Sequence, residues 1–290
     1  MTMHPRSVVV GVDGSPGRDA ALDWAVDEAS RRRLPLHLVH ATNVDYLVAA
    51  AMLNPADAPP AVDDLVEAAR DKVLAGSPDL RVTAEASTGA AAHDLVRRSE
   101  GAECVVVGAE GKSAVRGALG SVSLQVAMHA KCAVVVVRPA EAGAAEGPVV
   151  VGVDGSAISY EALGHAFERA SLRGVPLTVV YAWWIEFVDG VVVTTPGSPQ
   201  WRAVEERQRL AVAETMAGWT ERYPDVTVNV HIEHSRPIDA ITAASEGASL
   251  VVVGARGRGG FRGLLLGSVS HGVLHRAHCP VAVVRPRQAH

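Results

Sequence analysis

The sequence contains the same pattern twice, and this internal repeat limits the possible folds more than any other feature. Residues 7–15, SVVVGVDGS, return at 148–156 as PVVVGVDGS, and residues 99–108, SEGAECVVVG, return at 245–254 as SEGASLVVVG. The first pair is offset by 141 residues and the second by 146, so the motif order is kept and only loop lengths differ. Because solenoid repeats span only about 20–50 residues, each copy here should have a core of its own.

Apolar runs and amphipathic stretches alternate within each copy. In the first copy we expect strands at residues 8–12, 36–40, 81–85, 104–107 and 133–137 and helices at 20–32, 62–75, 90–98 and 121–129. The second copy repeats this order and ends in a strand at 281–284. Strands that alternate with helices form parallel sheets with helices on both faces. The sequence therefore predicts two α/β domains in tandem.

Length and composition agree with two globular domains. The chain has 290 residues, of which 48% are hydrophobic and 20% charged, as in a folded protein. The stretch 139–148, PAEAGAAEGP, lacks a core-facing pattern and is typical of a linker. We therefore predict domains at 1–138 and 149–290. A net charge of −5 and a pI near 6.2 provide no general attraction to nucleic acid or to an anionic membrane.

The cysteine pattern predicts a reduced, cytoplasmic protein. Cys104, Cys132 and Cys279 are too few and too scattered for a disulfide framework, and no C-x-x-C pair suggests zinc or redox chemistry. Cys132 and Cys279 each precede the last strand of a copy, as small buried hydrophobic residues would. The N-terminus leads into the first strand without an apolar signal region, and no stretch is long and apolar enough to span a bilayer.

A glycine pattern near the C-terminus predicts a pocket for a polyphosphate. The apolar run 249–253 is typical of a buried parallel strand, which delivers Gly254 to the carboxyl edge of the sheet. Gly254 and Gly257 permit backbone angles and close approaches that a Cβ atom would block. The segment 267–270 then begins a helix, whose unbonded backbone N–H groups and positive end favour an anion.

These features together resemble the universal stress protein family in its tandem two-domain form. The resemblance covers nearly all of both copies and rests on V-G-V-D-G-S after the first strand, on G-x-x-G, nine residues and G-S after the fourth, and on C-P-V-A-V-V-R at 279–285. It implies two Rossmann-like domains, each with a five-stranded parallel sheet and helices on both faces, with ATP across the carboxyl ends of the strands. It also implies adenine contacts at the backbone of Ala41 and Ala182.

The pattern and the resemblance together predict a set of nucleotide-binding residues. In the first copy these are Asp13, Ala41, Gly108, Gly111, Gly120 and Ser121. In the second copy they are Asp154, Ala182, Gly254, Gly257, Gly267, Ser268, Val269 and Ser270.

The aspartate and serine side chains in this set can have a structural role instead of a role in nucleotide binding. Asp13 and Asp154 end buried strands, where a carboxylate is costly unless a ribose hydroxyl, an adenine amino group or a metal ion satisfies it. The alternative is that each caps the helix that follows. The hydroxyl groups of Ser121 and Ser268 can donate to a phosphate or act as ordinary helix caps, and Ser270 is a weaker candidate.

Positive charge gathers beside the second glycine pattern. Arg256, Arg258 and Arg262 suit a triphosphate, with solvated surface arginines as the alternative. The first copy has Glu110 where the second has Arg256, and eight residues rather than nine between its second glycine and its Gly-Ser pair. We therefore predict that the C-terminal copy binds nucleotide more tightly than the N-terminal copy.

Two stretches without a clear pattern follow the second strand of each copy, at 42–61 and 183–200. Loops of this length act as lids or as plain connections. Tyr46, Trp183 and Trp184 within them can cover a nucleotide base or pack against a neighbouring domain.

Other nucleotide-binding classes do not fit the sequence. Gly11, Gly14 and Gly17 have the wrong spacing for the G-x-G-x-x-G of dinucleotide dehydrogenases, and no P-loop motif G-x-x-x-x-G-K-[ST] is present. The Ser-Gly-Gly loop of adenylate-forming enzymes is also absent after the first strand. Because no Ser/His/Asp triad or carboxylate pair stands out, no catalytic residue is predicted.

His271, His275 and His278 are the candidates for a metal site, because the first two lie one helical turn apart. The first copy has leucine, methionine and lysine at the matching positions, and no acidic third ligand is evident. We therefore expect solvated histidines at a helix end and no metal.

The sequence thus predicts an ATP-binding stress-response protein that acts through nucleotide-dependent conformation or partner binding, with at most slow hydrolysis. Mg²⁺ is expected with the triphosphate. The last strands, 133–137 and 281–284, are apolar and are expected at sheet edges, through which the family pairs domains, so we predict a homodimer through these edges. The alternatives are an interaction scaffold with decayed sites, and an ATPase or phosphotransferase that uses Asp154 to hold a metal.

Overall fold

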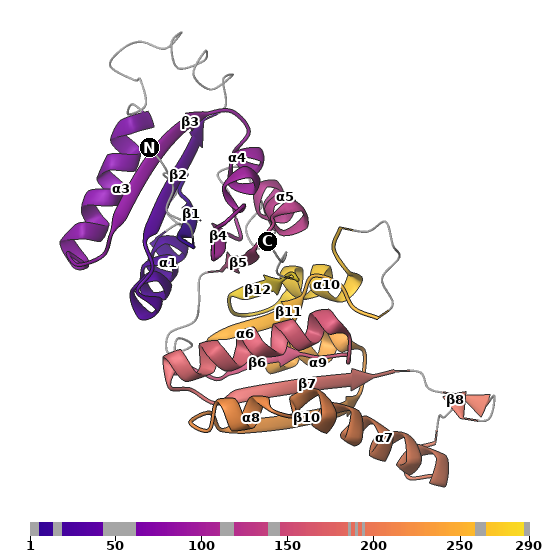
Figure 1. Cartoon of the computed structure of the whole chain (residues 1–290). Helices are drawn as coiled ribbons and strands as arrows, with labels where there is room; N and C mark the ends of the chain where they lie inside the picture. The colour runs from indigo at the N-terminus through magenta and orange to yellow at the C-terminus, as the bar shows by residue number, and fades with distance from the viewer. Residues whose placement is uncertain are drawn as a thin grey trace. The chain divides into compact units, whose positions relative to one another are not determined.

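The computed structural model describes residues 6–13, 19–42, 62–110, 119–138, 146–184, 187–188, 191–192, 195–258 and 265–286. They fall into two compact units, with described residues up to 138 in the first and from 146 to 286 in the second. Each unit is a parallel sheet between two layers of helices (Figure 1).

The first unit has five strands and four helices in its described part. In chain order these are β1 (Val8–Gly11), α1 (Asp19–Arg32), β2 (Leu36–Thr42), α3 (Val62–Gly76), β3 (Val82–Thr88), α4 (Ala91–Arg98), β4 (Cys104–Gly108), α5 (Ser121–His129) and β5 (Ala133–Val137). The strand order across the sheet is β5-β4-β1-β2-β3, and every pair is parallel. Helices α1 and α3 cover one face and α4 and α5 the other (Figure 1), as right-handed crossovers require.

The second unit repeats this architecture. Its elements are β6 (Val149–Gly152), α6 (Ala157–Arg173), β7 (Leu177–Trp183), β8 (Phe187–Val188), β9 (Val191–Val192), α7 (Pro199–Met216), α8 (Trp219–Arg222), β10 (Val228–His234), α9 (Pro237–Ala244), β11 (Leu250–Gly254), α10 (Ser268–Arg276) and β12 (Val281–Val284). The strand order is β10-β7-β6-β11-β12, again with parallel pairs throughout. The structure thus confirms the predicted fold class of two tandem α/β units with five-stranded parallel sheets.

The central strands of each sheet are buried on both faces. Residues 8–10 and 104–106 in the first unit, and 149–151 and 250–252 in the second, have no exposed surface. Because helices cover both faces, these strands carry unbroken apolar runs instead of alternating polar and apolar residues. The repeated motifs of the sequence are therefore the core strands of the two units.

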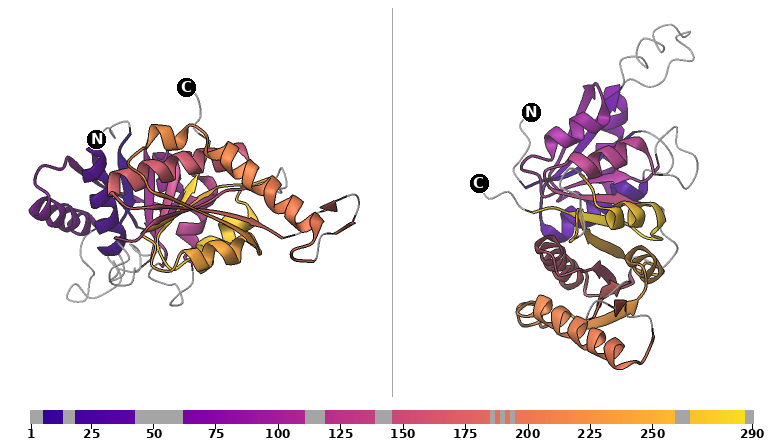
Figure 2. Two further views of the ribbon diagram at one scale, coloured as in Figure 1. Left: turned by 90° about the horizontal axis from the view of Figure 1, so that it is seen from below. Right: turned by 90° about the vertical axis from the view of Figure 1, so that its right-hand side faces the viewer.

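The described part of the stretch 183–200 contains regular elements that the sequence does not predict. Strand β7 continues to Trp183, β8 and β9 pair as a short antiparallel hairpin, and α7 begins at Pro199 with Ser198 as its N-cap. The hairpin lies beyond the carboxyl end of β7 (Figure 1, Figure 2). In the first unit, β3 extends to Thr88, past the predicted end at residue 85. Most of the corresponding stretch 42–61, including Tyr46, lies outside the described residues.

None of the three cysteines forms a disulfide bond. Cys104 and Cys279 are buried, whereas Cys132 is only half-buried, which differs from the prediction for that residue. Burial raises the pKa of the Cys104 thiol well above its ordinary value and that of Cys279 to about 12, so both stay protonated and act as small apolar side chains.

Within the described ranges, no helix combines the length and apolar character needed to cross a membrane.

Candidate functional site

A cavity of about 280 Å³ opens in the second unit at the carboxyl ends of β6, β7 and β11. The start of α9, the loop after β11 and the first turn of α10 complete its walls. All the residues that the sequence predicts for the second copy line it, namely Asp154, Ala182, Gly254, Gly257, Gly267, Ser268, Val269 and Ser270. The fold therefore brings together at one place residues that are more than a hundred positions apart in the chain.

The chemistry of the cavity wall changes from one element to the next. Strands β6 and β7 and helix α9 contribute apolar side chains, among them Val153, Val180 and Ile241. The loop after β11 and the start of α10 contribute Arg256 and backbone N–H groups. Sequence reasoning missed Ile241, because an apolar residue in an amphipathic helix carries no sign that it faces a cavity and not the core.

The first turn of α10 presents backbone N–H groups to the cavity. Its N-cap is Gly267, and His271 is the first residue whose N–H bonds within the helix, to Gly267 O at 2.9 Å. The N–H groups of residues 268–270 have no acceptor within the helix, as in any first turn, and these residues line the cavity. Together with the helix dipole they form a site for a negatively charged group.

Asp154 connects two loops of the cavity. Its Oδ1 accepts the N–H of Ser156 at 3.0 Å, and its Oδ2 accepts the N–H of Arg258 at 2.8 Å. Burial alone would raise the pKa of Asp154, but hydrogen bonds from the Ser156 side chain and from the backbone N–H groups of Arg258 and Ser156 outweigh burial and hold the pKa below its ordinary value. The N-cap of α6 is Ser156, so the predicted alternative of a helix cap is wrong for Asp154. The protein itself supplies part of what satisfies this carboxylate.

Close contacts explain two glycines of the cavity wall. A Cβ atom on Gly257 would collide with Asp154 Oδ2, and one on Gly254 would lie 2.6 Å from Ile158 Cγ2. Neither glycine has a positive φ angle. Of the two reasons that the sequence offered for these glycines, the structure therefore supports close approach and not unusual backbone angles.

The hydroxyl groups of Ser123 and Ser270 have the same partner in the two units. Ser270 Oγ donates to Gly254 O at 2.6 Å, and Ser123 Oγ donates to Gly108 O at 2.5 Å. Each bond ties the helix to the end of the strand that precedes the glycine loop. Since the hydroxyl proton of Ser270 is already donated, its contribution to an anion in the cavity comes from its backbone N–H.

Ser121 and Ser268 occupy the first helical position after a glycine N-cap. The N-caps are Gly120 and Gly267, so the predicted alternative that these serines cap their helices is wrong. Both serines are exposed, and Ser268 lines the cavity. A hydroxyl here is placed to donate to a group that binds the first turn of the helix.

The arginines of the glycine loop differ in their contacts. Arg256 and Arg258 are exposed and both line the cavity. Arg258 also turns back toward β6, with its Nη1 3.3 Å from Asp154 O. Arg262 lies outside the described residues.

In the first unit the predicted residues occupy the corresponding ends of strands. Asp13 follows β1, Ala41 lies in β2, Gly108 ends β4, and Gly120 and Ser121 begin α5, whereas Gly111 lies outside the described residues. Nearby, burial lowers the pKa of Arg138, and the opposite charge of Glu110 counters this effect. A carboxylate thus stands where the second unit presents Arg256.

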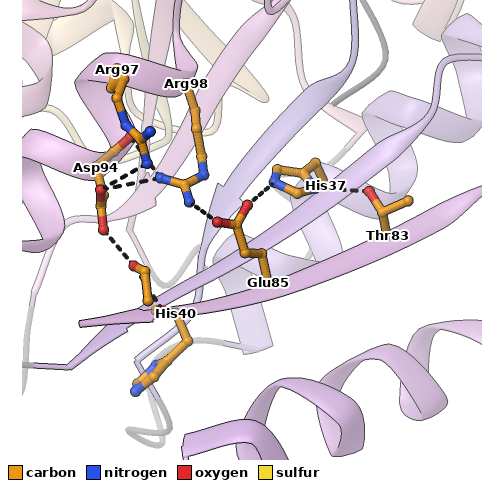
Figure 3. A network of polar contacts seen from close by, with 8 residues as sticks. His37, His40, Thr83, Glu85, Asp94, Arg97 and Arg98 are labelled. Atoms are coloured by element: carbon orange, nitrogen blue, oxygen red, sulfur yellow. Dashed lines mark hydrogen bonds and ion pairs between the residues drawn. The ribbon is translucent and has the colours of Figure 1, made fainter. Parts of the chain in front are cut away.

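A network of charged side chains on β2, β3 and α4 sets the first unit apart (Figure 3). Arg98 forms ion pairs with Glu85 and with Asp94, whose Oδ1 lies 3.3 Å from Arg98 Nη1. Ser87 donates a hydrogen bond to Asp94, and His37 Nε2 lies 3.5 Å from Glu85 Oε2. Sequence reasoning missed this network, although the spacing of Asp94 and Arg98 by one helical turn is typical of an ion pair.

Two groups of this network have shifted pKa values. Burial lowers the pKa of His37, and this effect outweighs the opposite influence of Glu85. Burial alone would raise the pKa of Asp94, but the Ser87 hydroxyl and the Arg98 guanidinium outweigh it, so the pKa lies below its ordinary value. His37 is therefore neutral and Asp94 ionised at neutral pH.

An aromatic cluster of Trp183, Trp184, Trp201 and His234 lies at the carboxyl ends of β7 and β10. The Trp183 ring is buried, with its centroid 4.8 Å from that of Trp201 and 4.5 Å from that of His234. The exposed Trp184 ring stacks on His234 at 5.5 Å. Trp183 thus packs within its own unit, a role that differs from both predicted ones, and the predicted place of Trp184 over a base stays a prediction.

The described part of the chain contains no group of three or more His, Cys, Asp or Glu side chains that can hold a metal ion. His271, His275 and His278 are all exposed. The rings of His271 and His275 are tilted by 50° to each other, with centroids 4.6 Å apart.

Comparisons with known proteins agree on one family. Its model, described as the universal stress protein family, matches residues 5–138 and again 147–285. Universal stress protein Rv2005c of Mycobacterium tuberculosis is 41% identical over 290 residues, and universal stress protein Rv2623 of the same species is 37% identical over 294 residues; each alignment covers 96% of this chain and 96% of the relative.

Solved structures show the same fold. A functionally unknown protein from Pseudomonas aeruginosa matches with a TM-score of 0.69, and a universal stress protein from Archaeoglobus fulgidus with 0.61. Both are 19% identical to this chain, cover 97% of it, and are themselves covered to 93% and 96%. At this identity the likeness bears on the fold alone.

Proposed function

The chain belongs to the universal stress protein family, and from that premise we propose that it binds ATP in the cavity of the second unit and acts as a nucleotide-dependent regulator of a stress response. Members of this family often bind adenine nucleotides. The observation that carries the proposal is the convergence of the residues predicted for the second copy on one cavity.

The cavity suits the two parts of an adenine nucleotide. The apolar wall of Val153, Val180 and Ile241 fits a planar base, for which Ala182 supplies a backbone edge. The first turn of α10 and the positive charge of Arg256 fit the phosphates. We expect Mg²⁺ to enter with the triphosphate, since this ion is usually held by phosphate oxygens, water and one or two carboxylates.

The same geometry supports at most slow hydrolysis. Among the described residues that line the cavity, Asp154 is the sole carboxylate, and both of its oxygens accept backbone N–H groups. A carboxylate held in this way, with a pKa below its ordinary value, is a weak general base. We therefore propose a sensor in which bound ATP, and not its turnover, is the signal.

Mass spectrometry of small molecules released from freshly purified protein tests this proposal. Recovered ATP, together with calorimetric binding of ATP and Mg²⁺ by stripped protein, supports the sensor. Recovered ADP with measurable turnover supports an ATPase. If the protein carries no nucleotide and gives no heat with ATP and Mg²⁺, the proposal is contradicted. The alternative of an interaction scaffold with decayed sites is then favoured.

The proposal includes a homodimer and a cytoplasmic location. Strands β5 and β12 are the terminal strands in the sheet order of their own units, and terminal apolar strands pair readily. The absence of disulfide bonds among the three cysteines supports a reducing compartment. Light scattering of the purified protein should give twice the mass of one chain, and a monomer would contradict the dimer.

A further inference from the structure

Helix α10 carries two histidines in an arrangement that its counterpart in the first unit lacks. His271 and His275 lie one turn apart, both are exposed, and their ring centroids are 4.6 Å apart. At the matching positions α5 has Leu124 and Met128. Because the two helices otherwise begin with the same Gly-Ser-Val-Ser sequence, the histidine pair is a specific difference between the copies.

The distance between the rings fits a shared metal ion. Imidazole nitrogen binds Zn²⁺ at about 2.0–2.1 Å, so two imidazoles at adjacent positions around one ion have their centroids roughly 4.5 Å apart at a 90° angle and about 5.2 Å apart at a tetrahedral angle. Histidines at i and i+4 of a helix are a known arrangement for this purpose. His278 is not part of the pair, because it follows the end of α10 at Arg276 and so does not share the helical spacing of the two histidines.

We propose that His271 and His275 form a surface site for a divalent transition-metal ion of the Zn²⁺ class. Two imidazole nitrogens hold the ion, and water fills its remaining positions. From the sequence we expect no metal, because the first copy lacks these histidines and no acidic third ligand is evident. Two imidazoles are nevertheless enough for an exchangeable site of this class. This site does not depend on the proposed nucleotide function.

The site has a structural consequence for α10. Gly272 stands between the two histidines, where a Cβ atom would lie 2.6 Å from Ile238 Cδ1 of α9. A glycine inside a helix costs about 1 kcal/mol relative to alanine, so close packing with α9 is obtained with an intrinsically weak helix. An ion shared by His271 and His275 binds only when the intervening turn is helical, and it therefore stabilises that turn.

This turn adjoins the N–H groups that face the cavity. His271 donates the first hydrogen bond within α10, to Gly267 O, directly after the three N–H groups of residues 268–270. A metal that holds residues 271–275 in the helix also holds the start of α10 in the conformation that presents these groups. The site thus stabilises the anion-binding end of the cavity without contacting it.

Calorimetric titration of the full chain with Zn²⁺ alone tests the site. The double variant His271→Leu/His275→Met carries the side chains that α5 has at these positions, and His278→Gln is the matched control for an exposed histidine outside the pair. We expect the wild type and His278→Gln to bind one equivalent of Zn²⁺ more than the double variant. Equal stoichiometry and affinity in all three proteins would overturn the proposal.

The single variants His271→Gln and His275→Gln test whether the double variant loses Zn²⁺ binding because of a folding defect. Each should lose the same equivalent of Zn²⁺ while keeping the melting temperature of the metal-free wild type. If either single variant still binds this Zn²⁺ ion with the affinity of the wild type, the ion is not shared by the two histidines and the proposal is wrong.

Amide hydrogen exchange tests the consequence for the helix. In the wild type, Zn²⁺ should slow exchange in peptides that cover α10 and leave peptides of α5 unchanged. In the double variant, Zn²⁺ should change neither. Slowing of α10 in the double variant, or none in the wild type at saturating Zn²⁺, would contradict stabilisation of α10 by the pair. None of these measurements uses nucleotide, so their failure is distinct from a failure of the proposed ATP site.

Discussion

The two units share one fold but differ in how α4 and its counterpart α9 cover the sheet. Helix α4 carries Asp94 and Arg98, which join a network of buried charges against β3. The matching positions on α9 are Ala240 and Ala244. The apolar β/α pattern that forms the core is kept in both copies, whereas the polar side chains around it have diverged. A shared fold therefore does not imply shared chemistry.

The candidate sites differ in the same way. The second unit places Arg256 beside the first turn of α10, and the first unit has Glu110 at the matching position. The glycines, the Gly-Ser helix start and the hydroxyl-to-carbonyl bonds of Ser123 and Ser270 are common to both. The backbone of a phosphate site is thus present in both units, and the two units differ in the charge beside it.

Of the proposed substitutions, removal of a member of the charged network should have the largest effect. Replacing Arg98 by alanine leaves Glu85 and Asp94 without their partner, and we expect the free energy of unfolding of the first unit to fall by about 3 kcal/mol. Urea denaturation of the full chain measures this change. Arg97→Ala is the matched control, because Arg97 is exposed and 3.4 Å from Asp94, and it should cost less than about 1 kcal/mol. Equal losses in the two variants would show that the network does not stabilise the unit.

Substitution of Gly257 tests the cavity of the second unit. A methyl group at this position collides with the Asp154 carboxylate, so the glycine loop or the Asp154 side chain must shift within the cavity wall. We expect Gly257→Ala to lower ATP affinity by roughly tenfold or more, measured by calorimetry. Gly76→Ala, where a Cβ atom meets nothing within 4 Å, should bind as the wild type does. Unchanged affinity in Gly257→Ala would place the nucleotide elsewhere.

Acid should weaken the first unit through His37. The pKa of His37 is lowered in the folded chain, so the unfolded chain binds the proton more readily. Stability is then complete above the unfolded pKa of about 6.5 and decreases as the pH falls below it. Denaturation at pH 7 and pH 5.5 should show this loss in the wild type. His37→Thr carries the residue of the second unit, Thr178, and should lose less stability over the same range; an equal loss would assign the effect to another group.

The smallest expected effect is that of charge beside the phosphate site. Arg256→Glu gives the second unit the residue that the first unit has, Glu110, and we expect ATP affinity to fall a few-fold, by about 1 kcal/mol or less, because Arg256 is exposed. Salt screens such a charge, so the difference should shrink between 50 and roughly 300 mM NaCl in calorimetric titrations. A difference independent of salt would mean that the substitution acts through the loop conformation.

Much of the candidate site was predictable because its residues follow the strands that the sequence marks clearly. A parallel strand delivers the residue after it to the carboxyl edge of the sheet, which places Asp154, Ala182 and Gly254 together once the strand order is known. The roles of side chains were less predictable. Ser270 bonds to the carbonyl of Gly254 across the glycine loop, and Asp154 accepts the N–H of Arg258, which lies more than a hundred positions away in the chain.

The duplication, the two parallel sheets and the edge at which the glycine loops lie can all be inferred from the sequence, since they follow from the local order of apolar runs and glycines. Which side chains contact one another became evident only from the folded chain. Arg98 forms an ion pair with Glu85, and the Trp183 ring packs against His234. Ile241 lines the cavity wall. All three contacts depend on packing between elements that no local pattern specifies. The physical reason is that backbone periodicity depends on neighbours in sequence, whereas polar and aromatic contacts depend on neighbours in space.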